Sequence, residues 1–363
     1  MSPGTDQRNV LRDRSAAPSG AAAGLSIVVP AYNEAASLAR VHARLTEVAQ
    51  KLASTRGLAC EVIYVDDGSA DDTLAIARAL PASALDVQVV SLSRNFGKEA
   101  ALLAGLDHAR LGAVLFIDGD GQHPPELIET LVGHWLDDDF DVVYTAKAHR
   151  DEESFVRRVA IKVFYALLNS DSHVQIPENA GDFRLLSPRA AKALRQMPER
   201  NRFFKGLASW IGFRQRRIDY EPAQRAQGRS QWGLRSLIGL SLNGLTAFSV
   251  APLRMATVFG LLLALIALIY GGKIIYETVV YGVSVPGYPS VFVGVMVLGA
   301  VQLVMLGVVG EYIGKILYEI KGRPVYFVAE HDVKLREEAA QSKSPPPYPP
   351  PQAGEDKVGA AAE

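Results

Sequence analysis

Two long stretches without a single charged residue constrain this chain most. The first, "MATVFGLLLALIALIYGG", covers residues 255–272, and the second, "VFVGVMVLGAVQLVMLGVVG", covers residues 291–310. A helix needs about 20 mostly apolar residues to cross the hydrocarbon core of a bilayer, and both stretches meet that length. Two buried helices of a soluble protein are the alternative, but core helices seldom run so long without a charge. The sequence therefore predicts a transmembrane helical hairpin over residues 255–313.

The basic residues around this hairpin predict its orientation. The connection over residues 277–290 contains neither Lys nor Arg, whereas basic residues flank the pair on its outer sides: Arg235, Arg254, Lys315, Lys321 and Arg323. Because cytoplasmic segments collect positive charge, we expect the N-terminal region and both termini in the cytoplasm, at the inner (plasma) membrane. Small residues such as Gly294, Gly299 and Gly307 favour close helix packing and leave a homo-oligomer open.

The rest of the chain divides into an ordered region and two polar ends. Residues 1–24 are polar and then rich in alanine and glycine, and residues 335–363 contain "SKSPPPYPPPQAGEDK". Proline runs of this kind do not hold a helix or a sheet interior, so we expect a disordered lead and a disordered Pro-rich tail. The remaining units are an α/β domain over 25–229, juxtamembrane amphipathic helices over 230–254 and a cytoplasmic extension over 314–334.

Residues 25–225 alternate between apolar, β-branched runs and amphipathic segments. The runs "LSIVVPAY", "EVIYVDD", "VQVVSLS" and "AVLFIDGD" are separated by helical patterns such as "KEAALLAGLDHAR". Near-continuous apolar strands between helices predict a mostly parallel sheet that is covered on both faces. Ligands of such sheets bind at the carboxyl ends of the strands. All four runs release polar residues there, so this edge of the sheet is the expected binding site.

Composition and missing motifs narrow the ligand. The formal net charge of −1 gives no reason to expect nucleic acid, and the lone Cys60 excludes an intramolecular disulfide framework. The G-x-G-x-x-G and G-x-x-x-x-G-K-[ST] phosphate motifs are absent after the first strand, which disfavours dinucleotide and P-loop sites. In "VLFIDGDGQHPPE", however, Asp118 and Asp120 follow a buried strand. Such a pair suits a hard divalent cation that also binds substrate phosphates.

These motifs resemble the family 2 glycosyltransferases with the GT-A fold. The matching pieces are "VVPAYNE", "YVDDGSADDT", "NFGKEAAL" and "DGDGQHPPE", and the likeness continues through "GDFRLLSP", "ERNRFFKGL" and the two apolar stretches. As an ordered set over residues 25–330 they resemble the polyprenyl-phosphate hexosyltransferases. This is the branch of dolichyl-phosphate mannose synthases and bactoprenol glucosyltransferases. The ending "GEYIGKILYEIKGRPVY" favours the bactoprenol group.

The resemblance implies a role for each matching residue. Asp118 and Asp120 would hold Mg²⁺ or Mn²⁺ with Gln122 completing the shell, and Asp182 and Arg184 would lie near the donor sugar and the acceptor. The nucleotide pocket would be lined by Pro30, Tyr32, Glu34, Asp67 and Asp118. Catalysis is assigned to Asp120, Asp182, Arg184, Arg202 and Lys205, and the acceptor phosphate and its loop to Arg184, Arg202, Lys205, Arg225 and Ser230.

Ordinary structural roles remain open for several neighbours. Asp71 and Asp72 suit a helix N-terminus, His123 suits a turn before two prolines, and Arg189, Arg195 and Arg200 suit a solvated surface. Two segments, 155–169 and 232–250, combine apolar and basic residues and predict helices lying in the membrane interface.

The reaction that the resemblance implies is transfer of a hexose from a nucleotide diphosphate sugar to a polyprenyl phosphate. A lipid phosphate is already ionised at pH 7, so it requires cationic positioning rather than a general base. We expect direct attack with inversion, UDP-glucose as donor and an orienting role for Asp182. GDP-mannose or a modified UDP-arabinose remain alternative donors, and a non-catalytic sugar-nucleotide-binding partner is the alternative class. A processive polysaccharide synthase is disfavoured because the chain lacks Q-x-x-R-W and further spans.

Overall fold

The computed structural model describes residues 22–147, 180–200, 202–220, 251–282 and 287–336. Several expectations fall outside these residues. They are the interfacial helices over 155–169 and 230–250, and the acceptor-loop residues Arg225 and Ser230.

The centre of the α/β domain is a sheet in the order β7-β5-β6-β4-β1-β2-β3-β8. Four parallel strands form its middle, and each corresponds to one of the apolar runs in the sequence. They are β1 (Ala22–Ala31), β2 (Ala59–Asp66), β3 (Asp86–Leu92) and β4 (Leu111–Phe116). Because β1 pairs in parallel with both β2 and β4, and β2 with β3, the carboxyl ends of all four lie at one edge. The expected α/β fold with a mostly parallel sheet is confirmed.

Within the described residues, four further strands complete the two edges of the sheet. These strands are β5 (Val142–Lys147), β6 (Ala180–Leu186), β7 (Gln215–Tyr220) and β8 (Val328–Lys334). β6 inserts between β4 and β5 and pairs antiparallel with both, while β5 and β7 pair in parallel. The antiparallel direction matters for the site, because it brings the first residues of β6 to the edge where β4 ends.

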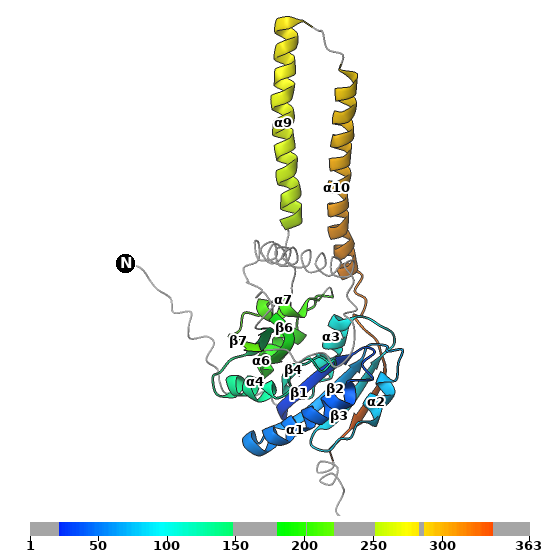
Figure 1. Cartoon of the computed structure of the whole chain (residues 1–363), viewed down its shortest axis with the longest axis vertical. Helices are drawn as coiled ribbons and strands as arrows, with labels where there is room; N and C mark the ends of the chain where they lie inside the picture. Colours follow the sequence, from blue (N-terminus) through cyan, green and yellow to red (C-terminus); the bar gives the residue numbers. More distant parts are fainter. Residues whose placement is uncertain (1–21, 148–179, 201, 221–250, 283–286, 337–363) are drawn as a thin grey trace, which may run out of the picture.

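Helices cover both faces of the sheet and bury a separate apolar layer on each (Figure 1). One layer packs beneath α1, α2 and α4 and includes Leu45 and Leu131. The other packs beneath α3, α6 and α7 and includes Leu102 and Leu207. The bounds are α1 (Leu38–Arg56), α2 (Thr73–Ala79), α3 (Lys98–His108), α4 (Leu127–Leu136), α6 (Pro188–Arg195) and α7 (Phe204–Trp210). Cys60 lies buried in the first layer.

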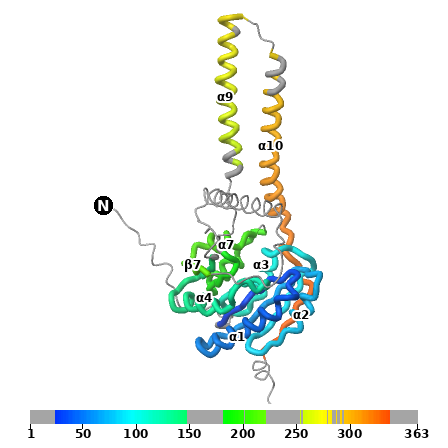
Figure 2. Tube along the Cα trace, in the orientation of Figure 1, coloured from blue at the N-terminus to red at the C-terminus, as the bar shows by residue number. Residues whose placement is uncertain are grey.

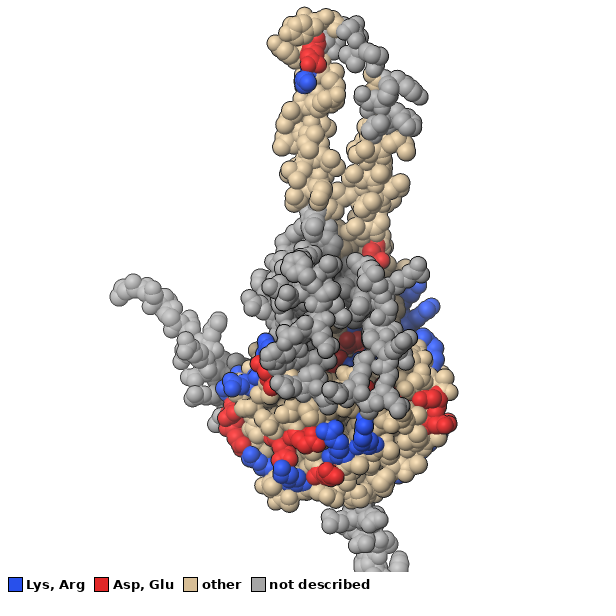
Figure 3. Space-filling view, viewed as in Figure 1, with Lys and Arg blue, Asp and Glu red and all other residues tan. Residues whose placement is uncertain are grey.

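Two long helices, α9 (Ala251–Tyr281) and α10 (Tyr288–Ile320), extend side by side away from the α/β domain (Figures 1 and 2). The stretches Ala256–Tyr281 and Gly294–Ile320 are long and apolar enough to cross a membrane, and neither is buried within the protein. Figure 3 shows their surface as almost uncharged. Exposed apolar area of this extent requires an apolar surrounding, so the hairpin associates with a membrane.

The segment after α10 returns to the α/β domain and packs against its sheet. β8 pairs antiparallel with β3, with Gln88 opposite Val333, and so covers the edge of the sheet. Arg78 contacts Glu330 and Asp332, and the phenol of Tyr326 donates to Asp107 at 2.9 Å. The expected extension over 314–334 therefore contains the last part of α10 and β8, which is an edge strand of the sheet.

The described residues extend slightly past the two expected boundaries of disorder. β1 begins at Ala22 and not after residue 24, since Gly24 pairs with Ala59 at a distance that leaves no room for a Cβ atom. At the other end, the backbone N–H of Arg336 donates to Asp86 at 2.9 Å, so the ordered chain runs past residue 335.

Candidate active site

The candidate site lies at the carboxyl edge of the four parallel strands. Asp66, at the end of β2, and Asp67 just beyond it are buried, and Asp118 follows β4. In the antiparallel pair of β4 and β6, Phe116 lies opposite Arg184. Continuing this register by two residues places Asp118 opposite Asp182. The sheet thus joins two carboxylates that the sequence separates by more than sixty positions.

Lys98 lies between these two carboxylates. Its Nζ is 2.6 Å from Asp118 Oδ1 and 2.6 Å from Asp182 Oδ2, while Lys205 Nζ is 3.4 Å from Asp182 Oδ1. Lys98 is the first residue of α3 and Lys205 the second of α7, so two helix starts supply the positive charge. The side chains of Lys98 and Asp118 remain 38 % and 23 % exposed. The ion pair is therefore open to a ligand.

Electrostatics keep all three groups of this cluster charged. Burial by itself would raise the pKa of Asp182, but Lys98 and Lys205 hold it well below its ordinary value. Burial likewise opposes ionisation of Asp118, and the neighbouring Lys98 with the His123 hydrogen bond keeps its pKa low. Burial would lower the pKa of Lys98, but Asp182 and Asp118 raise it. With such a low pKa, Asp182 is a poor proton acceptor at neutral pH.

His123 and Tyr220 support Asp118 from behind. His123 is 7 % exposed; its Nε2 lies 3.3 Å from Asp118 Oδ2, and its Nδ1 lies 2.8 Å from the phenol oxygen of Tyr220. Burial, and then the charges of Asp118 and Asp120, raise the pKa of Tyr220, so the phenol stays protonated and donates to Nδ1. His123 then donates from Nε2 to Asp118. His123 lies in a bend before the two prolines, as expected of a turn residue, and its ring in addition contacts a carboxylate of the site.

The carboxylates of Glu34 and Asp120 add to the negative charge of this edge. Burial raises the pKa of Glu34, and the charges of Asp120 and Asp118 raise it further against a hydrogen bond from Ser37. Asp120 Oδ1 accepts the backbone N–H of Gln122 at 2.9 Å. Carboxylates that repel one another in this way favour a bound cation.

The donor set also fits a divalent metal. In the described part of the chain no three His, Cys, Asp or Glu side chains converge as a complete metal cage. Mg²⁺ does not need one, because it is commonly held by one or two carboxylates together with substrate phosphates. Asp118 and Asp120 with the amide oxygen of Gln122 would supply the hard oxygen ligands for such an ion, and this assignment stays a prediction.

The structure brings together part of the predicted catalytic set. Arg184 is buried in β6 and donates to the carbonyl of Gly181 at 2.9 Å, close enough to Asp182 to lower its pKa. Arg202 lies farther from the cluster: its guanidinium donates to the carbonyls of Glu199 and Met197 at 2.9 and 2.6 Å.

The predicted nucleotide-binding residues Pro30, Tyr32 and Asp67 lie at the carboxyl ends of β1 and β2, on the same edge of the sheet. Pro30 is in β1, and Tyr32 follows it with 44 % of its surface exposed. Asp67 is 3 % exposed, and its two carboxylate oxygens accept the backbone N–H groups of Phe96 and Gly97 at 2.7 and 2.9 Å. Asp67 therefore holds the turn that leads into Lys98, and its contact with a nucleotide stays a prediction.

Arg195 and Arg189, which were expected on a solvated surface, both make specific contacts in the structure. Arg195 is not simply solvated, because its guanidinium donates to the carbonyls of Leu106 and Ala109 between α3 and α6. Asp71 does act near the start of α2, where Oδ1 accepts the N–H of Thr73 at 3.1 Å, while Asp72 makes no side-chain cap. Arg189 forms an ion pair with the buried Asp141.

Sequence reasoning missed the central cation of the site. The available signal was its position within "NFGKEAAL", directly after Gly97. In the structure this glycine has a φ of +96°. Glu99 was missed as well: its Oε2 accepts the N–H of Phe204 at 2.9 Å and so ties α3 to the start of α7.

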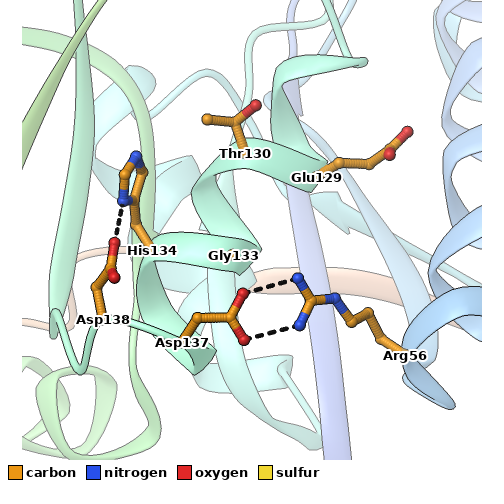
Figure 4. A pocket seen from close by; sticks show the side chains of 7 residues that line it. All are labelled: Arg56, Glu129, Thr130, Gly133, His134, Asp137 and Asp138. Atoms are coloured by element: carbon orange, nitrogen blue, oxygen red, sulfur yellow. Dashed lines mark hydrogen bonds and ion pairs between the residues drawn. The ribbon is translucent and has the colours of Figure 1, made fainter.

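A separate depression of about 420 Å³ lies between the ends of α1 and α4 (Figure 4). Arg56 contacts Asp137 there through two hydrogen bonds of 2.8 and 2.7 Å, His134 contacts Asp138 at 2.6 Å, and Glu129 forms an ion pair with Lys51 outside the lining at 2.8 Å. Because α1 runs antiparallel to β1, its last turn lies at the opposite edge of the sheet. This depression does not belong to the candidate site.

Comparison with known proteins finds matches for most of the sheet domain and for the helical hairpin. The model of glycosyl transferase family 2 matches residues 26–195, and that of the GtrB C-terminal hairpin matches residues 251–316. An uncharacterized glycosyltransferase of Synechocystis sp. is 42 % identical over 84 % of this chain and 95 % of its own length. A prophage-derived bactoprenol glucosyl transferase of Shigella flexneri is 41 % identical over 84 % and 97 %. The putative glycosyltransferase CsbB of Bacillus subtilis is 38 % identical over 85 % and 92 %. This chain therefore belongs to glycosyl transferase family 2 and is a membrane-associated glycosyltransferase of the branch that includes the bactoprenol glucosyl transferases.

Proposed function

We propose that this enzyme transfers glucose from UDP-glucose to a polyprenyl phosphate at the cytoplasmic face of the membrane. The observation that carries the proposal is the Asp118–Lys98–Asp182–Lys205 cluster at the edge of a sheet that is joined to an apolar hairpin. The relatives named as bactoprenol glucosyl transferases, similar over most of both chains, support the lipid acceptor and the sugar.

The leaving group of this reaction is a nucleoside diphosphate, which gains negative charge as the glycosidic bond breaks. Asp118, Asp120 and Gln122 would hold Mg²⁺ or Mn²⁺, which when bound stabilises that charge on the diphosphate oxygens. Tyr220 and His123 keep Asp118 oriented for this task through the hydrogen bonds of 2.8 and 3.3 Å. Pro30, Tyr32, Glu34 and Asp67 would line the nucleotide pocket beside it.

The acceptor phosphate needs positioning, not deprotonation. Lys205 and Arg184 lie beside Asp182 and provide cationic groups for an ionised phosphate. We assign Arg202 and the loop residues Arg225 and Ser230 to the same acceptor region. Two lysines keep Asp182 ionised, so it serves to orient its neighbours and the sugar rather than to take up a proton. The phosphate oxygen then attacks the anomeric carbon directly and inverts its configuration.

The hairpin explains how such an enzyme meets a lipid substrate. α9 and α10 extend from the same side of the catalytic domain, so both ends of the hairpin share one side of the membrane (Figure 1). The basic residues that flank the hairpin, among them Lys315 and Lys321, support a cytoplasmic location for that side. The acceptor phosphate at the headgroup level would then be presented to the catalytic domain.

The test is a donor panel with the purified full chain in detergent and undecaprenyl phosphate as acceptor. UDP-glucose, GDP-mannose and a UDP-linked 4-amino-arabinose, each with labelled sugar, are compared with and without EDTA. We expect label in the organic phase only from UDP-glucose and only without the chelator. Label from another donor would change the assigned sugar, and activity that persists after complete chelation would contradict the metal site.

A matched pair of variants completes the test. Asp120→Asn should lose turnover while keeping its elution volume and thermal midpoint, because it changes one metal ligand at constant volume. Asp138→Asn, which alters a carboxylate at the opposite edge of the sheet, should retain full activity. A non-catalytic binding partner would bind UDP-glucose and yield no lipid-linked label in any of these samples.

A further inference from the structure

We propose that Lys98 is the resident counter-ion of the metal-free site, and that it gives up Asp118 when the divalent cation binds with the donor. The inference rests on the proposed metal-dependent function and adds to it an internal competitor for the metal. The observation behind it is the position of one ammonium group, 2.6 Å from Asp118 and 2.6 Å from Asp182.

The charge balance explains why such a counter-ion is needed. Asp118, Asp120 and Asp182 are carboxylates of one edge, and Glu34 feels the charges of Asp118 and Asp120. Without a cation, bringing these groups together would be strongly unfavourable. Lys98 neutralises Asp118 and Asp182, which face each other at the ends of β4 and β6. It therefore keeps the site in shape before a divalent cation binds.

The position of Lys98 is held by the backbone around it. Asp67 accepts the N–H groups of Phe96 and Gly97 at 2.7 and 2.9 Å, and Gly97 has a φ of +96° that only glycine adopts at low cost. The side chain beyond Cα is by contrast long, flexible and 38 % exposed. A fixed base with a mobile ammonium group suits an ion that must change partners.

The metal and Lys98 compete for the same atom. Asp118 Oδ2 already accepts from His123, which leaves Oδ1, the atom that Lys98 contacts, as the oxygen that faces an incoming ligand. Two cations sharing this oxygen would repel each other. The diphosphate of the donor provides new oxygen partners for the displaced ammonium group. The bare metal is therefore predicted to bind weakly, and the metal with a nucleoside diphosphate to bind well.

Lys98→Met tests this competition because it removes the charge and keeps the length of the side chain. Mn²⁺ binding to the purified full chain, without nucleotide, is measured by electron paramagnetic resonance. We expect the Kd for bare Mn²⁺ to fall about tenfold and the Kd for UDP in the presence of Mn²⁺ to rise. Lys205→Met removes the same charge but contacts only Asp182, at 3.4 Å, so its Kd for bare Mn²⁺ should change much less.

The outcomes separate this inference from the proposed function. An unchanged or weaker affinity of Lys98→Met for bare Mn²⁺, or equal tightening in both variants, would overturn the competition. A wild-type chain that binds no Mn²⁺ even with UDP would overturn the metal-dependent function itself. Should Lys98→Met not fold, Lys98→Gln keeps a hydrogen-bond donor between the carboxylates while removing the charge, and the same tightening is expected.

Discussion

Glu99 offers a quantitative test of the electrostatics around the site. Burial, and then the nearby charge of Asp182, raise the pKa of its carboxyl from 4.5 to about 7. Its Oε2 accepts the backbone N–H of Phe204 at 2.9 Å, which connects the helix that carries Lys98 to the helix that carries Lys205. Glu99→Gln preserves this acceptor and the side-chain volume, and it removes the ionisation.

The raised pKa has a definite consequence for stability. Below pH 4.5 the carboxyl is protonated in both the folded and the unfolded chain. As the pH rises from 4.5 to about 7, ionisation occurs mainly in the unfolded chain, so the folded state loses stability. The difference between a pKa of 4.5 and one of about 7 corresponds to roughly 3.4 kcal/mol, and because the Glu99 side chain is partly exposed we expect about 2 kcal/mol.

The assay is the thermal midpoint of the full chain in detergent, measured from pH 4.5 to pH 8 for the wild type and for Glu99→Gln. About 2 kcal/mol corresponds to roughly 4–8 °C for a domain of this size, so the variant should gain about that much on the wild type across the range. Glu129→Gln, at an ion pair with Lys51 on the surface, serves as control. Parallel curves for the wild type and Glu99→Gln would refute the reasoning.

Three further predictions concern the framework of the site. Gly105→Ala should destabilise the chain by about 1–3 kcal/mol in chemical unfolding, because its Cβ would overlap Val28 Cγ1. Gly133→Ala in α4 is the control: its Cβ meets no atom within 3.6 Å, so the same assay should show a gain in stability of about 0.5–1 kcal/mol. Glu61→Ala should cost about 3–5 kcal/mol, because the fully buried carboxylate pairs with Arg110 at 2.7 Å and also accepts from Ser26 and Gln88. The exposed pair of Arg44 and Glu126 provides the comparison, since Glu126→Ala should cost no more than about 1 kcal/mol. Deleting residues 328–363 removes β8 and uncovers the edge of β3, so size-exclusion chromatography should show association that the full chain does not.

Much of the binding edge could be predicted from the sequence because strand direction follows from local pattern. Four apolar runs separated by helices imply parallel strands, and parallel strands bring Asp67 and Asp118 to one edge. The composition of the cation cluster could not be predicted in this way. Asp182 is the third residue of β6, an antiparallel strand inserted beside β4, and nothing in the local pattern of "AGDFRLL" indicates which strand β6 pairs with. Lys98 and His123 were consequently assigned no site role, although both lie within recognisable motifs.

The sequence by itself determined the membrane hairpin, the parallel core of the sheet and the acidic edge, because hydrophobic length and periodicity act through neighbouring residues. Only the tertiary structure decided that Lys98 bridges Asp118 and Asp182, that Tyr220 orients His123, and that β8 pairs with β3 as an edge strand after the chain leaves the hairpin. Those contacts depend on the register between distant strands. Register is set by the packing of the whole core, so it cannot be read from any single segment.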